Sequence, residues 1–256
     1  MFGWFKDRRR KRIREQPFPE KWEAILKQEI WQTGQIPEEF DERWRKLIQV
    51  FVAEKNFEGC NGLKLSEKMK VIVAAYACLL VVGLPEDEYF NNVLSILIYP
   101  KSFVGKETQV LGSGVVLESQ QARIGEAWYR GPVVLSWSDI SELRYRDDPG
   151  RNVVLHEFAH QLDMLNGRSV DGTPPLHSQE LWNRWSGVVQ EGYEELLSAS
   201  RAGEPTFLDT YGATNRAEFF AVATEAFFED AFEFRMHHPE LYEVFTDYYR
   251  LNPANW

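Results

Sequence analysis

Hydrophobic positions in the first third of the chain recur at intervals of three and four residues. One such stripe consists of Trp44, Leu47, Ile48 and Phe51. This spacing places apolar side chains on one face of an amphipathic helix, so we expect residues 20–84 to be mainly helical. Val71–Leu84 is apolar almost throughout, and its 14 residues span about 21 Å as a helix, which is short of the roughly 30 Å of a bilayer core. The pattern predicts a buried core helix and no transmembrane segment.

The middle of the chain, residues 93–140, changes to short apolar runs between glycine-containing turns. The candidate strands are Val93–Tyr99, Gly114–Leu117, Ala127–Tyr129 and Pro132–Trp137. Runs of this kind, bounded by Gly and Pro, are typical of strands and predict a small mixed sheet. The last run has the alternation of a sheet-edge strand, which would add an extended peptide, and an ordinary interior strand fits it equally well.

Helical periodicity returns after residue 150. The expected helices cover about 151–165, 178–200, 215–229 and 239–250. Helices, then strands, then helices predict an α+β fold rather than alternating strand–helix units. We expect residues 15–256 to form one mainly helical domain, with the sheet between a helical N-terminal part and a helical part over residues 151–250.

The formal charge of −10 is unevenly distributed along the chain. Residues 1–14 hold seven Lys and Arg against one Asp and carry +6, which leaves −16 on the remainder. So acidic a body is a poor ligand for nucleic acid, because phosphate binding requires a basic face. We expect residues 1–14 to be a solvated, flexible tail, and contact of Met1–Phe5 with a membrane surface is the less favoured alternative.

Two further features bear on the cellular compartment. No apolar stretch of the length found in secretory signals follows the N-terminal basic residues. The chain has only two cysteines, Cys60 and Cys78, so a disulfide framework is not expected. Both features favour the cytoplasm.

The strongest chemical signal is the sequence His-Glu-Phe-Ala-His at residues 156–160, which has the form H-E-x-x-H. Residues four apart share one helical face, so His156 and His160 can direct their imidazoles at a single ion. Glu157 can then reach a metal-bound water without binding the metal itself. Two incidental surface histidines are the alternative, but the apolar neighbours favour a buried helix, where unpaired His and Glu are costly.

A catalytic zinc ion needs a third protein ligand and an open fourth position. Glu218 is the favoured candidate, because it lies in the first turn of a very apolar helix with Thr214 or Asn215 as the expected N-cap. A simple capping role for Glu218 is the alternative. The remaining histidines are weaker candidates: His177 follows two prolines, and His237 and His238 are adjacent and do not converge on one ion.

Several blocks of sequence resemble the Mlc titration factor family of bacterial gluzincin-type metallopeptidases. They are LSILIYP (94–100), GPVVLSWSDI (131–140), HEFAHQLDMLNG (156–167) and AEFFAVATEAFF (217–228), together with Tyr211 seven residues before Glu218. The resemblance covers most of residues 20–250 and leaves out the basic segment. The family is similar in its catalytic core to the anthrax lethal factor metalloprotease.

The resemblance implies one Zn²⁺ per chain with His156, His160 and Glu218 as ligands. It also implies Glu157 as the general base and Tyr211 as an auxiliary hydroxyl that stabilises the oxyanion. The residues alone favour the alternative that Tyr211 is a loop aromatic side chain packed at the start of a helix. The expected activity is cytoplasmic zinc-dependent hydrolysis of peptides or unfolded segments, with aminopeptidase action as one form of it.

Two acidic residues are candidates to support the ligands. Asp163 lies three residues beyond His160 and either accepts a hydrogen bond from a ligand imidazole, as the resemblance favours, or is solvated. Many gluzincins carry an acid four residues past the ligand Glu, where this chain has Val222. Glu225, seven residues past Glu218, either takes that role or is a surface charge.

A second class of function competes with catalysis. The family name records an association with the glucose-responsive repressor Mlc, so the chain is alternatively a protein that sequesters a transcriptional repressor and has little peptidase activity. A purely structural zinc ion is disfavoured, because two His and one Glu leave a coordination position open.

Overall fold

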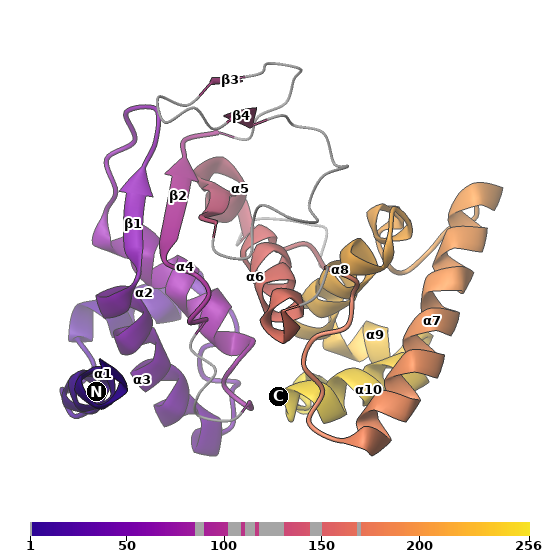
Figure 1. Cartoon of the computed structure of the whole chain (residues 1–256), viewed down its shortest axis with the longest axis horizontal. Coiled ribbons are helices and arrows are strands. Elements are labelled where there is room, and N and C mark those ends of the chain that lie inside the picture. The colour runs from indigo at the N-terminus through magenta and orange to yellow at the C-terminus, as the bar shows by residue number, and fades with distance from the viewer. Residues whose placement is uncertain are drawn as a thin grey trace.

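The computed structural model describes residues 2–84, 90–101, 109–110, 116–117, 131–143, 150–167 and 170–256. The expected strand Ala127–Tyr129 lies outside these residues. The described part confirms an α+β fold that is mainly helical. Figure 1 shows α6 (Val153–Asp163) in the middle of the molecule, with the N-terminal helices and the sheet on one side and the C-terminal helices on the other.

The N-terminal part contains four helices. They are α1 (Phe2–Arg14), α2 (Glu20–Glu29), α3 (Glu38–Glu54) and α4 (Glu67–Leu79). Helix α4 is the expected core helix: Ser66 caps it by accepting a hydrogen bond from the amide of Met69, and its residues from Val71 onward are buried. The Trp44 side chain is fully buried, and its Nε1 donates to the carbonyl oxygen of Ala75 at 2.9 Å, which ties α3 to α4.

Three parallel strands form the central sheet. They are β1 (Asn56–Gly59), β2 (Ser95–Tyr99) and β5 (Val133–Ser136), in the order β1-β2-β5. A separate antiparallel pair consists of β3 (Gln109–Val110) and β4 (Val116–Leu117). The expected single mixed sheet is therefore replaced by a parallel sheet and a separate pair. Among the described strands β5 pairs only with β2, so it lies at the edge of the sheet that the described residues form.

The C-terminal part is helical. It contains α5 (Trp137–Glu142), α6 (Val153–Asp163), η2 (Met164–Asn166), α7 (Gln179–Ala202), η3 (Thr210–Ala213), α8 (Arg216–Glu229), α9 (Ala231–His237), α10 (Pro239–Tyr249) and η4 (Pro253–Asn255). Helix α6 packs against β5, α4 and α8, so the H-E-x-x-H segment lies at the junction of the two halves. Four elements, β1, β3, α5 and α9, were not expected from the sequence.

The expectation of a flexible N-terminal tail is wrong, because residues 2–14 form helix α1 and pack on α3. Arg10 is 6% exposed, and its Nε and Nη2 donate to the two carboxylate oxygens of Glu54 at 2.9 and 2.7 Å. Arg9 Nη2 donates to the carbonyl oxygen of Ala53 at 3.0 Å. The Glu54 carboxylate and the Ala53 carbonyl oxygen at the end of α3 bind these cations, and this match between distant residues is not visible in the sequence of α1 itself.

In the part of the chain that the structure describes, no helix combines the length and the apolar character needed to cross a membrane.

Candidate metal centre

Helix α6 directs both histidines toward α8. Asn152 starts the helix, and its Oδ1 accepts hydrogen bonds from the amides of Val154 and Leu155 at 3.1 and 3.2 Å. The apolar face of α6 is fully buried in the core; it comprises Leu155, Phe158, Ala159 and Leu162. Burial of that face fixes the rotation of the helix, so the imidazoles at positions 156 and 160 share the face that meets α8.

Helix α8 supplies the third member of the cluster. Asn215 caps it, with its Oδ1 accepting a hydrogen bond from the amide of Glu218 at 3.0 Å. The helix is buried from Ala217 to Phe228, and Glu218 is only 3% exposed. A carboxylate is costly at this depth unless it is paired, so its position indicates a function beyond capping.

The three side chains form a nearly equilateral triangle of donor atoms. Glu218 Oε2 lies 3.0 Å from His156 Nε2 and 3.4 Å from His160 Nε2, and the two Nε2 atoms are 3.2 Å apart. Two ligand atoms at about 2.05 Å from a tetrahedral ion are about 3.3 Å apart. The spacing and the His₂Glu donor set therefore fit one divalent metal ion, and among the described residues this is the group of His, Cys, Asp and Glu with suitable geometry.

The other histidines are engaged elsewhere. His177 Nε2 contacts the carbonyl oxygen of Tyr248 at 2.9 Å, and the two rings are stacked. His237 ends α9 and stacks on Phe207, while His238 precedes α10. None of the three belongs to the triangle.

The pKa values of His156 and Glu218 show how strongly these two side chains interact with their neighbours. Burial lowers the pKa of His156, but its hydrogen bonds with Glu218 and Glu225 outweigh burial and raise the pKa to about 10. Burial raises the pKa of Glu218, yet its hydrogen bonds with His156 and His160 lower the pKa to about 2. The carboxylates thus make this buried site favourable for positive charge.

Glu225 is buried and contacts the cluster, which disagrees with a surface-charge interpretation. Its Oε1 lies 2.7 Å from His156 Nδ1, and its Oε2 accepts a hydrogen bond from the backbone amide of Asn152. A carboxylate at Nδ1 holds a proton on that nitrogen, so Nε2, which faces the triangle, is the nitrogen that a metal ion would bind. Position 225 is therefore placed where it can orient a metal ligand.

Glu229, one turn further along α8, was missed by sequence reasoning. It accepts hydrogen bonds from Asn152 Nδ2 at 2.6 Å, from Trp31 Nε1 at 2.8 Å and from Gln32 Nε2 at 3.5 Å. Burial raises the pKa of Glu229 despite these donors. The available signal was its spacing of four from Glu225 in an otherwise apolar helix, because two buried carboxylates require polar partners.

Asp163 has a different role from the one expected. Its side chain is fully buried, and its two oxygens accept hydrogen bonds from the amides of Gly172 and Thr173 at 2.8 and 2.9 Å. The predicted hydrogen bond to a ligand imidazole is not formed, and His160 Nδ1 has no partner among the described residues. The loop after α6 brings two amides closer to the carboxylate than the imidazole, and sequence spacing could not show this.

Glu157 and Tyr211 lie on the border of the cluster. The Glu157 side chain is half-buried and makes no hydrogen bond or ion pair with another residue in the described ranges. Tyr211 lies in η3, where Asp209 accepts a hydrogen bond from its amide, and its ring centroid is 5.9 Å from that of His156. Both are positioned near the metal cluster, Glu157 with an uncommitted carboxylate.

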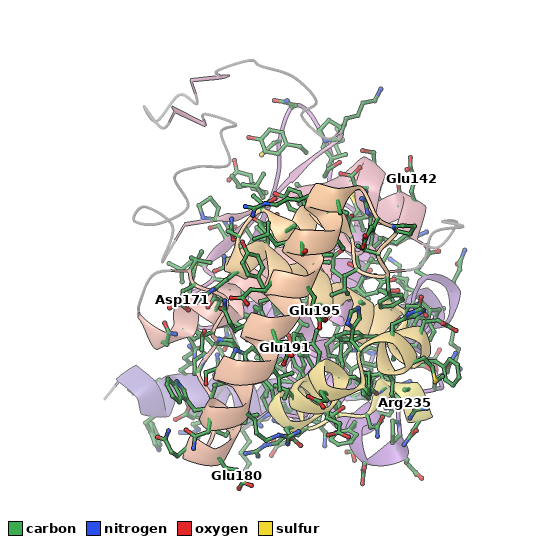
Figure 2. The ribbon with its side chains drawn as sticks, turned by 90° about the vertical axis from the view of Figure 1, so that its right-hand side faces the viewer. Glu142, Asp171, Glu180, Glu191, Glu195 and Arg235 are labelled. Carbon is green, nitrogen blue, oxygen red and sulfur yellow. The ribbon has the colours of Figure 1, made fainter. Side chains whose placement is uncertain are left out.

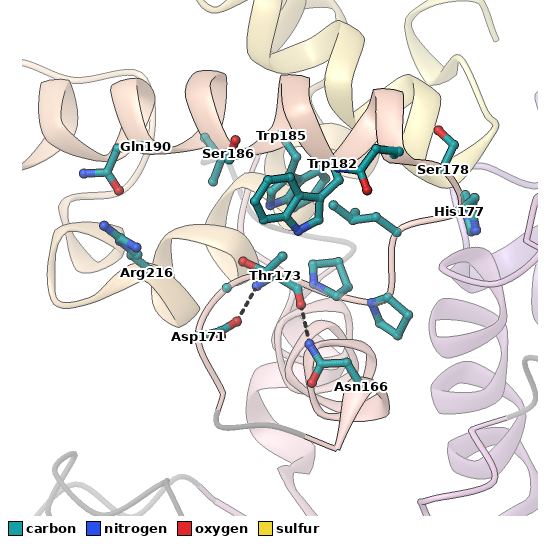
Figure 3. Close-up of a pocket in the computed structure, with 16 residues that line it drawn as sticks. Asn166, Asp171, Thr173, His177, Ser178, Trp182, Trp185, Ser186, Gln190 and Arg216 are labelled. Atoms are coloured by element: carbon teal, nitrogen blue, oxygen red, sulfur yellow. Dashed lines mark hydrogen bonds between the residues drawn. The ribbon is translucent and has the colours of Figure 1, made fainter.

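A cavity of about 720 Å³ opens between α7 and the loop that Asp163 holds (Figure 3). Trp182, Trp185 and Arg216 are among its lining residues. Asn166 donates to the carbonyl oxygen of Thr173 at 2.8 Å and thereby secures one wall. None of the three cluster residues lines this cavity, so it is a neighbour of the metal site and not part of it.

Comparison with known proteins agrees with this geometry. Residues 4–250 match the family described as "Glucose-regulated metallo-peptidase M90". A Synechocystis sp. protein described only as uncharacterized is 38% identical over 248 residues, which are 96% of this chain and 90% of the relative. Mlc titration factor A of Cronobacter sakazakii is 31% identical over 93% of this chain and 87% of its own length, and that of Escherichia fergusonii is 32% identical over 81% and 77%. The match begins at residue 4, so it includes the basic segment that the resemblance was expected to leave out.

Proposed function

We propose, since this chain belongs to the family of glucose-regulated metallopeptidases M90, that it hydrolyses peptide bonds at a zinc site held by His156, His160 and Glu218. The observation that carries the proposal is the triangle of donor atoms with sides of 3.0 to 3.4 Å. Two imidazoles and one carboxylate leave a coordination position open, as catalytic zinc sites do. The cysteines that would close a structural site are elsewhere, with Cys78 buried in α4.

The residues around the triangle have separate tasks. When bound, the zinc ion acts as a Lewis acid that polarises a peptide carbonyl and makes a water molecule more acidic. Glu157 accepts the proton of the attacking water and passes it to the leaving amine. The Tyr211 hydroxyl donates a hydrogen bond to the negative charge that develops on the carbonyl oxygen. Glu225 keeps the Nδ1 proton of His156 in place and so fixes the orientation of the imidazole.

The peptide substrate is proposed to lie along β5. This strand packs beside α6 and has one neighbour in the described sheet, so its free edge offers backbone hydrogen bonds to an extended chain. Strand addition recognises the backbone and tolerates varied side chains. We therefore expect hydrolysis of unfolded segments, either internally or from the amino end.

The decisive experiment replaces Glu157 by Gln. The Glu157→Gln variant is expected to keep its metal content and thermal stability while kcat/KM for fluorogenic peptides falls by about 10²- to 10⁴-fold, the range typical of a lost general base. Peptides with free and blocked amino termini distinguish exopeptidase from endopeptidase action. Glu191→Gln, an exposed change of the same kind on α7, is the control and keeps full activity. If the Glu157→Gln variant hydrolysed the peptides at the wild-type rate, Glu157 would not be the general base.

The names of the relatives support a second candidate function. Proteins called Mlc titration factor A match 81–93% of this chain, so we propose that it also binds a repressor of the Mlc type. Binding of purified repressor is measured with wild type and with Glu157→Gln, which separates binding from hydrolysis. Retained binding together with no hydrolysis of any peptide by the wild type would make repressor sequestration the main function.

A further inference from the structure

The outward face of α1 combines exposed aromatic and cationic side chains. Trp4 and Phe5 are each 60% exposed, and the exposed cations on the same face are Arg8, Lys11 and Arg12. At 100° per residue, these five side chains fall within an arc of about 120° around the helix. The acidic Asp7 lies outside that arc. Glu15, just after the helix, lies 4.0 Å from Lys11, so the face carries three positive charges and one negative charge and keeps a net charge of +2.

The opposite face of α1 fixes the orientation of the helix. Arg10 makes its two hydrogen bonds to Glu54 on α3, and both side chains are nearly buried. Lys6 Nζ donates to Asn91 Oδ1 at 2.6 Å. These contacts lie on the inner face of α1. The helix therefore cannot rotate to bury Trp4 and Phe5 without breaking the nearly buried ion pair of Arg10.

The two aromatic rings form an apolar ridge among the cations. Trp4 and Phe5 meet edge to face with centroids 5.1 Å apart, and the Arg8 guanidinium lies 5.4 Å from the Trp4 ring. Exposed apolar surface bordered by polar groups is typical of an interaction site. A helix with Trp and Phe between Lys and Arg is the composition that lies in the headgroup region of a membrane.

Charge is also separated across the molecule. Helix α1 lies at one edge and α7 at the opposite edge (Figure 1). The outward face of α7 is acidic, with Glu180, Glu191 and Glu195 exposed (Figure 2). An anionic surface therefore attracts the molecule at the α1 edge and repels the α7 edge, which selects one orientation.

We propose that the outward face of α1 docks this protein on the surface of a membrane that contains anionic lipids. The aromatic ridge enters the interface between headgroups and acyl chains, and Arg8, Lys11 and Arg12 bind the lipid phosphates. A flat bilayer accepts the convex face of a helix. A nucleic acid would be bound better by a concave basic groove in which bases can stack.

The charges set the size of the effect. One Lys or Arg near an anionic bilayer contributes about 5-fold in affinity, so the three cations together contribute about 100-fold. Screening by salt should remove most of this gain, because exposed charges interact over about one Debye length. The aromatic pair adds a contribution that does not depend on salt.

The test is sedimentation of the full-length protein with vesicles of phosphatidylcholine alone and of phosphatidylcholine mixed with phosphatidylglycerol. Binding to the mixed vesicles only, weakened by salt, is expected. The triple change Arg8→Ser, Lys11→Ser and Arg12→Ser should lower the affinity about 100-fold. The separate double change Trp4→Ala and Phe5→Ala should lower the affinity for vesicles at high salt as well, because the charges are screened there and the aromatic contribution remains.

A matched control exists on α9, where the Arg235 guanidinium lies 5.7 Å from the ring of Phe232, which is 56% exposed. Phe232→Ala with Arg235→Ser should leave vesicle binding unchanged. Absence of binding by the wild type overturns the proposal, as does equal loss in the α9 control. Tighter binding to a single-stranded oligonucleotide than to the mixed vesicles would also overturn it. Each variant is checked by thermal unfolding, so loss of the fold is not counted as loss of docking.

Discussion

Replacing Glu225 by Gln tests whether the carboxylate behind His156 supports the metal site. The change keeps the size of the side chain and removes its charge. Glu225 Oε1 is 2.7 Å from His156 Nδ1, and Oε2 accepts from the amide of Asn152. An amide group has one oxygen for these two donors, so either the imidazole or the backbone N–H faces an NH₂ group and loses its acceptor.

The size of the loss follows from these contacts. A hydrogen bond to a charged group contributes about 1.5–3 kcal/mol. Loss of the partner of a ligand histidine typically weakens metal binding about 10- to 100-fold, which corresponds to about 1.4–2.7 kcal/mol. The two estimates agree. Because bound metal stabilises the fold in proportion to the logarithm of its affinity, the increase in Tm on adding zinc should shrink by about 3–10 °C.

Zinc affinity is measured by competition with a chelator of known affinity, and Tm is measured with and without zinc. Glu191→Gln removes the same charge from the exposed face of α7 and serves as the control (Figure 2). If Glu225→Gln binds zinc as tightly as the control does, the orienting role of Glu225 is refuted. Weakened binding in both variants would point to the net charge and not to the hydrogen bond.

Three further changes probe the fold. Arg10→Met should lower the free energy of unfolding by up to about 3 kcal/mol in urea titrations, because it leaves Glu54 nearly buried without its partner, and Glu54→Met in the same chain should restore most of the loss. Gly172→Ala should destabilise the fold far more than Gly167→Ala, although both glycines have positive φ. A Cβ at 172 would lie 2.3 Å from the carbonyl oxygen of the first residue of α8, whereas a Cβ at 167 would have no atom close to it. Burial lowers the pKa of Lys55 from 10.5 to about 8. Between these two pH values only the unfolded chain holds the proton on Lys55. The free energy of unfolding of the wild type should therefore rise with pH by up to about 1.4 kcal/mol per pH unit relative to that of Lys55→Met. Below pH 8 the difference in free energy of unfolding between the two proteins should not change with pH.

Local pattern was sufficient for the parts of the molecule that local physics determines. The spacing of His156 and His160 predicted a shared helical face, and Asn215 was one of two expected caps for the helix that carries Glu218. The buried helix α4 and strand β2 followed from their apolar runs. Each of these depends on residues within a few positions of one another.

The failures concern partners that are distant in the sequence. Four residues of β1 carry no strong pattern and become a strand because β2 pairs with them, which no local window shows. Helix α1 depends on an acid 44 residues away. Asp163 binds amides nine and ten residues ahead and not the imidazole three residues behind. In each case tertiary contacts decided among alternatives that the local sequence left open.

The contacts of Glu229 determine whether the metal-binding half can be a separable module. Every residue of the triangle lies between 150 and 256, yet two of the three donors to Glu229, Trp31 and Gln32, come from the turn after α2. A fragment that began at β5 would expose the core face of α6. Of the three donors to Glu229, it would keep only Asn152. The half that contains the ligands therefore depends on the other half, and a chain split between the halves would regain all three donors to Glu229 only when its N-terminal fragment binds again. Metal affinity would then measure how well two separately made fragments reassemble.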